Sequence, residues 1–235
     1  MINYIHLCTL IAFTLLMGCS QKENTENTMT DSPFTYLALG DSYTIGEGVE
    51  EGDRYPNQTV SLLHEKGYSF EKPTIIAKTG WTTDELQQGI AESEIAGKSY
   101  DLVTLLIGVN NQYRGRALDN YENEFRSLLE QAIRFANNKA DHVVVISIPD
   151  WGITPFAEER KTDRGKVSQE IDLFNASNRT ISEDLGVHYI EITARYRAIG
   201  AAPEMLVADK LHPSSKVYAE WAKDLSALIV ERMNF

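Results

Sequence analysis

FTYLALGDSYTIG, residues 34–46, runs from a short apolar segment into the tripeptide Gly40-Asp41-Ser42. A continuous apolar segment of this length is typical of a strand that is buried on both faces of a parallel sheet. The glycine at its end lets the chain turn sharply, and the turn presents the hydroxyl of Ser42. Because a serine hydroxyl alone is a weak nucleophile, chemistry at Ser42 requires a base, an acid that orients the base, and donors for an oxyanion.

Four further apolar runs follow at intervals along the chain. They are Pro73–Ala77, Leu102–Ile107, His142–Ile148 and Val187–Ile190. Segments with helical character lie between and after them, at about 55–66, from 82 onward, and at about 118–137, 169–185 and 214–233. This alternation predicts an α/β fold in which right-handed crossovers join five parallel strands. Residues 33–235 show no internal repeat and no break in composition, which predicts a single domain.

The chain is acidic. Its 235 residues include 34 Asp and Glu against 22 Lys and Arg, so its formal net charge is -12. Such a chain repels phosphate backbones, and nucleic acid is therefore not an expected partner. The pair His64-Glu65 lacks the second histidine of a zinc-binding helix, and no other spacing is typical of a metal site. We expect neither a metal nor a cofactor.

The N-terminal residues predict an export signal. The largely apolar run that ends at residue 18 is too short to span a membrane, which predicts a signal peptide over residues 1–18. The sequence Leu16-Met17-Gly18-Cys19 resembles a bacterial lipoprotein cleavage box and predicts Cys19 as the lipidated mature N-terminus. Residues 19–32 are polar and predict a flexible tether ahead of the domain. We expect a protein of the bacterial cell envelope that meets the membrane only through a lipid on Cys19; a plainly secreted protein is the alternative.

Polar residues that could do chemistry follow several of the predicted strands. Gly80 comes after the second strand, Asn110 after the third, and Asp209-Lys210-Leu211-His212 just before the last helix. Ligands of such sheets bind beyond the carboxyl ends of the strands, so we expect these residues to converge on Ser42. Each has an ordinary alternative as a turn residue. Their joint occurrence in this order is difficult to explain by turns alone.

Together these segments resemble a known family. Gly40-Asp41-Ser42, Gly80, Gly108-Val109-Asn110 and Asp209–His212 match the four blocks of the SGNH hydrolases, also called GDSL esterases and lipases. The resemblance extends from about residue 35 to residue 213. It implies a flavodoxin-like three-layer α/β/α sandwich around a five-stranded parallel sheet, and ester hydrolysis without a metal or a cofactor.

The chain departs from the family pattern at two positions. Tyr43 stands where the family has leucine, and Asn111 stands where an aspartate often follows the block-three asparagine. The Gly-x-Ser-x-Gly elbow of the α/β-hydrolases is absent, because Thr44 occupies the place of its second glycine. The α/β-hydrolase fold is therefore not expected.

The resemblance implies a role for each block. Ser42 is the expected nucleophile, His212 the base that accepts its proton, and Asp209 the acid that orients the imidazole. The backbone N–H groups of Ser42 and Gly80 and the side-chain amide of Asn110 are the expected oxyanion donors. We expect Asp41 to brace the turn rather than to do chemistry.

Aromatic side chains cluster near these motifs and are candidates for substrate binding, with ordinary packing as the alternative. They are Tyr43, Trp81, Tyr113, Trp151 and Phe156. The long connection over residues 149–167 is a candidate lid or binding loop. The predicted function is hydrolysis of small-molecule acyl esters by a carboxylesterase or lysophospholipase-like enzyme. Deacetylation of a glycan ester is the first alternative, and an acyltransferase or an inactive binding lipoprotein on the same fold are the others.

Overall fold

The computed structural model describes residues 32–233 and residue 235. The predicted signal peptide, Cys19 and the predicted tether up to residue 31 lie outside the described residues and stay predictions. Contacts divide the chain after Ser32, and Pro33–Phe235 is the unit that carries the sheet. No helix among the described residues is both long enough and apolar enough to cross a membrane.

A parallel sheet of five strands lies at the centre of this unit. The strands are β1 (Tyr36–Gly40), β2 (Thr74–Ala77), β3 (Leu102–Leu106), β4 (Val143–Ile146) and β5 (His188–Ile190). Their order in space is β2-β1-β3-β4-β5, so the connection from β2 to β3 passes over β1. The point where the strand order reverses therefore lies at β1 and β3, where ligands of open α/β sheets bind. Each predicted apolar run overlaps one strand, and the predicted α/β fold is confirmed.

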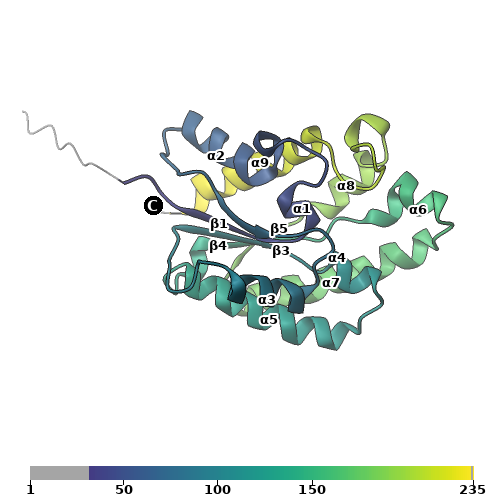
Figure 1. Cartoon of the computed structure of the whole chain (residues 1–235), viewed down its shortest axis with the longest axis horizontal. Coiled ribbons are helices and arrows are strands. Elements are labelled where there is room, and N and C mark those ends of the chain that lie inside the picture. Colours follow the sequence, from purple (N-terminus) through teal and green to yellow (C-terminus); the bar gives the residue numbers. More distant parts are fainter. Residues whose placement is uncertain (1–31, 234) are drawn as a thin grey trace, which may run out of the picture. The chain divides into compact units, whose positions relative to one another are not determined.

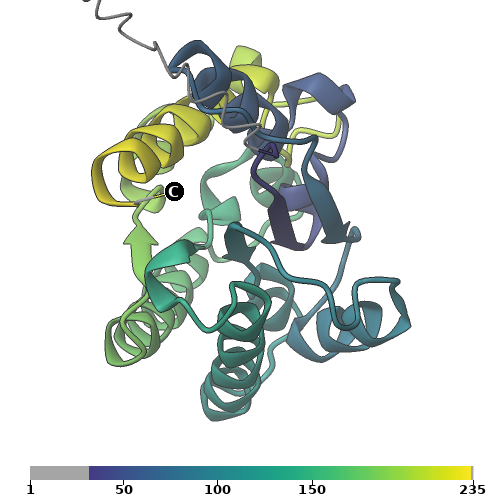
Figure 2. The ribbon, with the colours of Figure 1, turned by 90° about the vertical axis from the view of Figure 1, so that its left-hand side faces the viewer.

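Long helices cover both faces of the sheet (Figure 1). On one face α2 (Tyr55–Glu65) packs against α9 (Ser215–Arg232). On the other face lie α3 (Thr83–Glu92), α5 (Leu118–Phe135) and α7 (Arg164–Asp184). Figure 2 shows the same two helical layers from the side, with the sheet between them. Three- and four-residue spacing of apolar side chains on α5 predicts its buried face, which includes Tyr121, Phe125 and Leu128.

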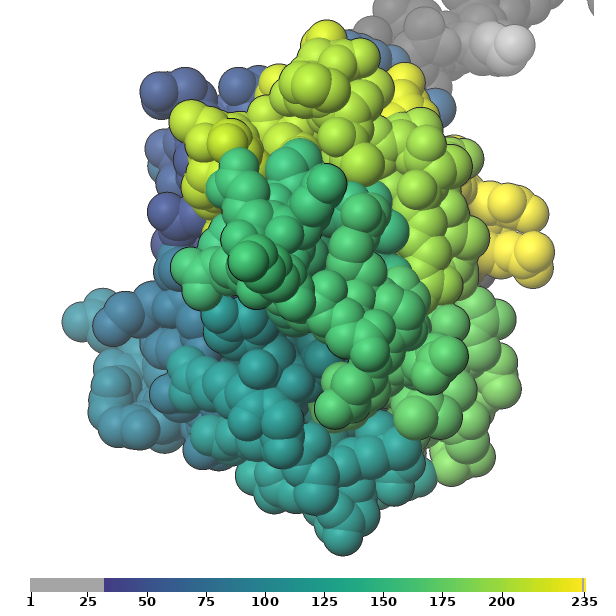
Figure 3. Space-filling model, turned by 90° about the vertical axis from the view of Figure 1, so that its right-hand side faces the viewer, coloured from purple at the N-terminus to yellow at the C-terminus, as the bar shows by residue number. Residues whose placement is uncertain are grey.

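Short helical segments follow or connect the strands. They are α1 (Ser42–Ile45), α4 (Val109–Tyr113), α6 (Pro155–Glu159), α8 (Thr193–Ile199) and the 3-10 turns η1 (Glu51–Asp53), η2 (Ala140–His142), η3 (Trp151–Ile153) and η4 (Pro203–Met205). The predicted loop over residues 149–167 contains η3, α6 and the start of α7, so helical turns form much of it. In Figure 3, which views the end of the molecule beyond the carboxyl ends of the strands, this green segment lies between the yellow-green segment that precedes α9 and the teal segment that contains α4.

Gly40 ends β1 for a reason other than the predicted turn. Its φ is not in the left-handed region, where several other glycines of the chain lie. A Cβ at this position would lie 2.1 Å from Thr44 Oγ1 and 2.4 Å from the carbonyl oxygen of Leu106. The second contact is with the backbone of the neighbouring strand, which cannot give way as a flexible side chain does. Glycine is therefore required by the close approach of Thr44 and of the Leu106 carbonyl to this position.

Candidate active site

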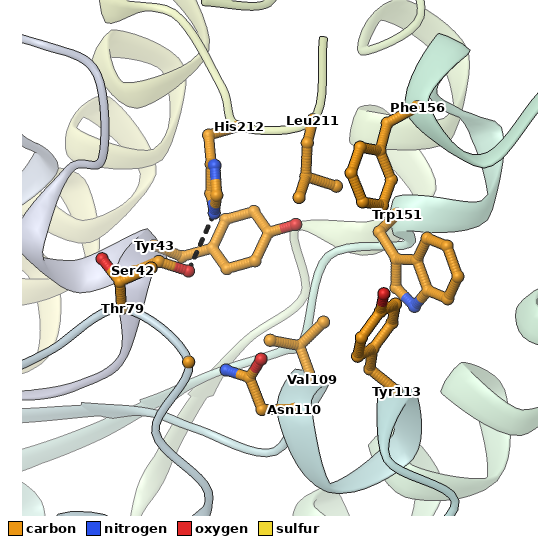
Figure 4. Close-up of a pocket in the computed structure, with 11 residues that line it drawn as sticks. Ser42, Tyr43, Thr79, Val109, Asn110, Tyr113, Trp151, Phe156, Leu211 and His212 are labelled. Atoms are coloured by element: carbon orange, nitrogen blue, oxygen red, sulfur yellow. Dashed lines mark hydrogen bonds between the residues drawn. The ribbon is translucent and has the colours of Figure 1, made fainter. Parts of the chain in front are cut away.

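Ser42, His212 and Asp209 form a continuous chain of hydrogen bonds. The Nε2 atom of His212 lies 2.9 Å from the Oγ of Ser42, and its Nδ1 lies 2.6 Å from the Oδ2 of Asp209. Figure 4 shows the bond between the serine and the imidazole, at the edge of a cavity. Ser42 and His212 are buried, whereas the Asp209 side chain is 41% exposed. The three residues predicted from separate parts of the sequence are thus brought together.

The loop before α9 fixes the orientation of the imidazole. Asp209 Oδ1 accepts hydrogen bonds from the backbone N–H groups of Leu211 and His212, at 2.8 Å and 2.9 Å, and leaves Oδ2 for His212 Nδ1. Partial burial raises the pKa of Asp209, but the hydrogen bonds from His212 and Leu211 outweigh it and lower that pKa below its usual value. The carboxylate therefore stays ionised and accepts the Nδ1 proton, so that Nε2 is available to accept a proton from Ser42.

The three residues predicted to supply oxyanion donors all line the cavity beside Ser42. Ser42 is the first residue of α1, so its backbone N–H has no acceptor within the helix. Gly80 has a φ of +85°, a conformation that favours glycine, and the cavity is lined by Gly80 and Asn110 together with Ser42. The Nδ2 of Asn110 donates to the carbonyl oxygen of Trp81 at 3.0 Å and lies 3.5 Å from Asp41 Oδ2. The amide is thus held with its donor end at the side of the cavity where Ser42 lies (Figure 4).

Asp41 is fully buried and forms the N-terminal cap of α1. Its Oδ1 accepts a hydrogen bond of 3.0 Å from the backbone N–H of Tyr43, so the side chain braces the turn as predicted. Burial raises the pKa of Asp41 from its ordinary value to about 7, although the hydrogen bonds from Tyr43 and Asn110 act in the opposite direction. The folded protein therefore binds a proton at Asp41 more tightly than the unfolded chain does.

This difference predicts a pH-dependent stability that Asp41→Asn should remove. The pKa of Asp41 rises from 3.8 to about 7 on folding, so its contribution to stability is complete below about pH 4 and is lost as the pH rises to about 7. The free energy of unfolding should decrease by about 4 kcal/mol over this range relative to Asp41→Asn, whose amide can still cap α1. Urea unfolding from pH 4 to pH 8 measures it. The exposed Glu94→Gln is the control and should keep the wild-type slope. Identical slopes in the wild type and Asp41→Asn would contradict the prediction.

The cavity beside Ser42 has a volume of about 170 Å³ and a mainly apolar lining. Its lining residues are Ser42, Tyr43, Thr79, Gly80, Val109, Asn110, Tyr113, Trp151, Phe156, Leu211 and His212. Four of the predicted substrate-binding aromatic residues, all except Trp81, are among them. The ring of Trp81 instead packs on Gly89 of α3, where a Cβ would lie 2.0 Å from the indole. Thr79, Val109 and Leu211 were not predicted, although each is next in sequence to a motif residue.

Three aromatic rings form the wall of the cavity opposite Ser42 (Figure 4). Tyr113 and Trp151 have ring centroids 5.1 Å apart, and Trp151 and Phe156 have centroids 6.2 Å apart, both nearly perpendicular. Edge-to-face pairs of this kind are favourable. Tyr113 is 48% exposed and lies at the mouth, whereas Trp151 is buried.

Buried polar contacts that the sequence did not predict hold Trp151 in place. Its Nε1 donates to Gln112 Oε1 at 2.7 Å. The preceding Asp150 is fully buried and accepts hydrogen bonds from Gly152 N, Ser168 Oγ and Arg197 Nε, at 2.9 Å, 2.5 Å and 2.8 Å. These contacts tie the turn that carries Trp151 to α7 and α8. No cluster of three or more His, Cys, Asp or Glu side chains suited to a metal ion occurs in the part of the chain that the structure describes.

Comparison with known proteins identifies the family. The sequence profile of the GDSL-like lipase/acylhydrolase family matches residues 38–220, and the chain belongs to this family. No curated protein sequence gives a significant match.

Solved structures share the fold at low sequence identity. TesA matches with a TM-score of 0.64 and 17% identity over 85% of this chain and 99% of that chain. Axe2 from Geobacillus stearothermophilus is an acetylxylan esterase that was solved as a catalytic mutant. It matches with a TM-score of 0.66 and 19% identity over 84% of this chain and 94% of that chain. A lipase/acylhydrolase from Enterococcus faecalis matches with a TM-score of 0.64 and 20% identity over 86% of this chain and 97% of that chain. The chain is thus an ester hydrolase of the SGNH fold.

Proposed function

We propose that this protein is a serine esterase that hydrolyses carboxylic acyl esters through an acyl-enzyme on Ser42. The observation that carries the proposal is the hydrogen-bonded chain from Ser42 through His212 to Asp209, at the edge of an apolar cavity. This arrangement supplies a nucleophile, a base and an oriented acid within hydrogen-bond distance of one another.

The geometry supports a two-step reaction. Ser42 Oγ attacks the ester carbonyl carbon and gives its proton to His212 Nε2, while the carbonyl oxygen becomes an oxyanion that accepts hydrogen bonds from Ser42 N, Gly80 N and Asn110 Nδ2. Collapse of this intermediate breaks the bond to the alcohol oxygen, which takes the proton from His212. A water molecule then attacks the acyl-enzyme, loses a proton to His212, and releases the carboxylic acid as Ser42 regains its proton.

The cavity favours acyl groups of short to medium length. An apolar protein cavity of about 150 Å³ holds a molecule the size of benzene. The cavity beside Ser42, at about 170 Å³, is similar, and apolar side chains dominate its lining. It therefore accepts an acyl group of roughly that bulk with its apolar part against Trp151 and Phe156.

A series of p-nitrophenyl esters from acetyl to palmitoyl tests this proposal. We expect kcat/KM to rise from acetyl to an optimum near butyryl or hexanoyl, because each methylene buried in the cavity adds apolar contact. Longer chains should lose kcat/KM once the cavity is full. The measurement is initial-rate release of p-nitrophenol, with Ser42→Ala as the control for background hydrolysis. An optimum at palmitoyl would contradict the size argument.

Deacetylation of a glycan is the second candidate function. The exposed ring of Tyr113 at the cavity mouth could stack on a sugar, and the similar fold of the acetylxylan esterase Axe2 gives this candidate added weight. A rate that is highest for acetyl and collapses by butyryl would favour it. Release of acetate from an acetylated polysaccharide, compared with release of butyrate from tributyrin, separates the two candidates directly.

A further inference from the structure

Arg160 follows the last residue of α6 and contacts two aromatic residues that line the cavity. Its guanidinium carbon lies 4.1 Å from the centroid of the Phe156 ring, and its Nη1 lies 3.4 Å from the hydroxyl of Tyr113. The side chain is exposed to solvent and bridges α6 and α4 beside the mouth. These contacts fix the position of a positive charge next to the aromatic wall.

No carboxylate among the described residues lies within ion-pairing distance of Arg160. Other cations near the site differ: Arg114, which touches Gly80 O, is 3.0 Å from Glu85, and Lys210 pairs with Glu159. The neighbouring Glu159 is thus engaged elsewhere. In a chain with a formal net charge of -12, a guanidinium without such a partner beside the cavity is available to a ligand.

The sign of this charge selects among ligands for the aromatic wall. Three rings around an apolar cavity could form a cage for a quaternary ammonium group. Arg160 already places a cation on Phe156, so a second cation there would be repelled. A carboxylate, that of Glu47, lies on the other side of the cavity, where it accepts a hydrogen bond from Thr79. The mouth is therefore asymmetric in charge, and it favours an anion at the Phe156 side.

We propose that Arg160 binds an anionic group of the ester substrate, a carboxylate or a phosphate, while the ester carbonyl lies at Ser42. The planar guanidinium suits either anion, because it can donate two parallel hydrogen bonds to a pair of oxygens. This inference rests on the proposed esterase function and adds a substrate class to it. The anion belongs to the acyl group or to the alcohol, and matched substrates distinguish these two sources.

The experiment compares two anionic esters with their neutral counterparts. Mono-p-nitrophenyl glutarate carries a carboxylate on the acyl side and is compared with p-nitrophenyl valerate. Butyryl-glycerol phosphate carries a phosphate on the alcohol side and is compared with monobutyrin. The readout is the ratio of kcat/KM for each anionic ester to that of its neutral counterpart, measured for the wild type, Arg160→Gln and Arg160→Lys.

We expect at least one ratio to fall about threefold to fivefold in Arg160→Gln through a higher KM, with partial rescue in Arg160→Lys. That ratio should also decrease with added salt, because exposed charge pairs are screened. Lys139→Gln is the control. It also removes one exposed positive charge, but Lys139 precedes β4 and so lies at the end of that strand away from the site; both ratios should stay unchanged. If both ratios were the same in Arg160→Gln and the wild type, the inference would be overturned. This includes the case in which the variant loses activity equally on the anionic and the neutral ester. Absence of any Ser42-dependent hydrolysis would instead overturn the proposed esterase function.

Discussion

Ser42→Ala should lower kcat by about 10⁴-fold or more on every ester that the wild type hydrolyses. The only side-chain hydrogen bond of the Ser42 hydroxyl in the described residues is that to His212 Nε2, so the hydroxyl has no evident role in holding the fold. Alanine removes the atom that bonds to the acyl carbon and leaves the cavity and the oxyanion donors in place. The residual rate then comes from binding and from those donors alone.

Two measurements separate loss of the nucleophile from loss of the fold. The thermal midpoint of Ser42→Ala should stay close to that of the wild type, and a fluorophosphonate probe should label the wild type but not the variant. Ser61→Ala removes a hydroxyl from the exposed face of α2 and is the matched control for both. A Ser42→Ala variant that kept more than a few per cent of wild-type kcat would show that another group attacks the ester.

Local sequence patterns were enough to predict the sheet and the order of the site residues. An apolar run of about five residues is too short for a typical helix, and its alternation with helical segments favours a strand that a parallel sheet buries on both faces. The carboxyl ends of such strands meet at one edge, so residues 42, 80 and 110 had to lie near one another once the strand order was set. The position of His212 was harder to predict, since no strand leads directly into its loop, and the family resemblance added the support that strand ends gave the other residues.

Features that depend on tertiary packing could not be predicted. Trp81 and Trp151 both follow strands, yet one ring packs on Gly89 and the other lines the cavity. The side to which each indole turns depends on a space between helices that no local pattern encodes. Gly40 is similar, because its need for glycine comes from the backbone of β3, far away in the sequence.

The ion pair between the buried Asp150 and the half-buried Arg197 is the clearest omission. The two residues are 47 positions apart, and nothing in the local sequence indicates that they pair. Because Asp and Arg side chains are mostly exposed in proteins, both would be placed at the surface. Their contact ties η3 to α8 and thereby fixes where Trp151 stands. The aromatic residues of the wall could be predicted from the sequence, but the polar contacts that hold them in place are seen only in the folded structure.

Asn110→Ala should lower kcat about 100- to 1,000-fold while KM changes little. The amide donates to Trp81 O, and its Nδ2 lies on the Ser42 side of the cavity, where the proposed mechanism places the oxyanion. A donor is worth more to an oxyanion than to a neutral carbonyl, so its loss affects the transition state more than substrate binding. Steady-state kinetics with p-nitrophenyl butyrate measures both parameters, and Asn123→Ala on the exposed face of α5 is the control.

Asn110→Asp makes the test specific for charge. It keeps the shape of the side chain but replaces the donor with a carboxylate that faces the developing oxyanion, so kcat should fall further than in Asn110→Ala. A loop displaced by the lost contact with Trp81 O would instead raise KM and lower the thermal midpoint in both variants alike. If both variants kept kcat within about threefold of the wild type, the oxyanion would have to be stabilised by the backbone N–H groups of Ser42 and Gly80 without the amide.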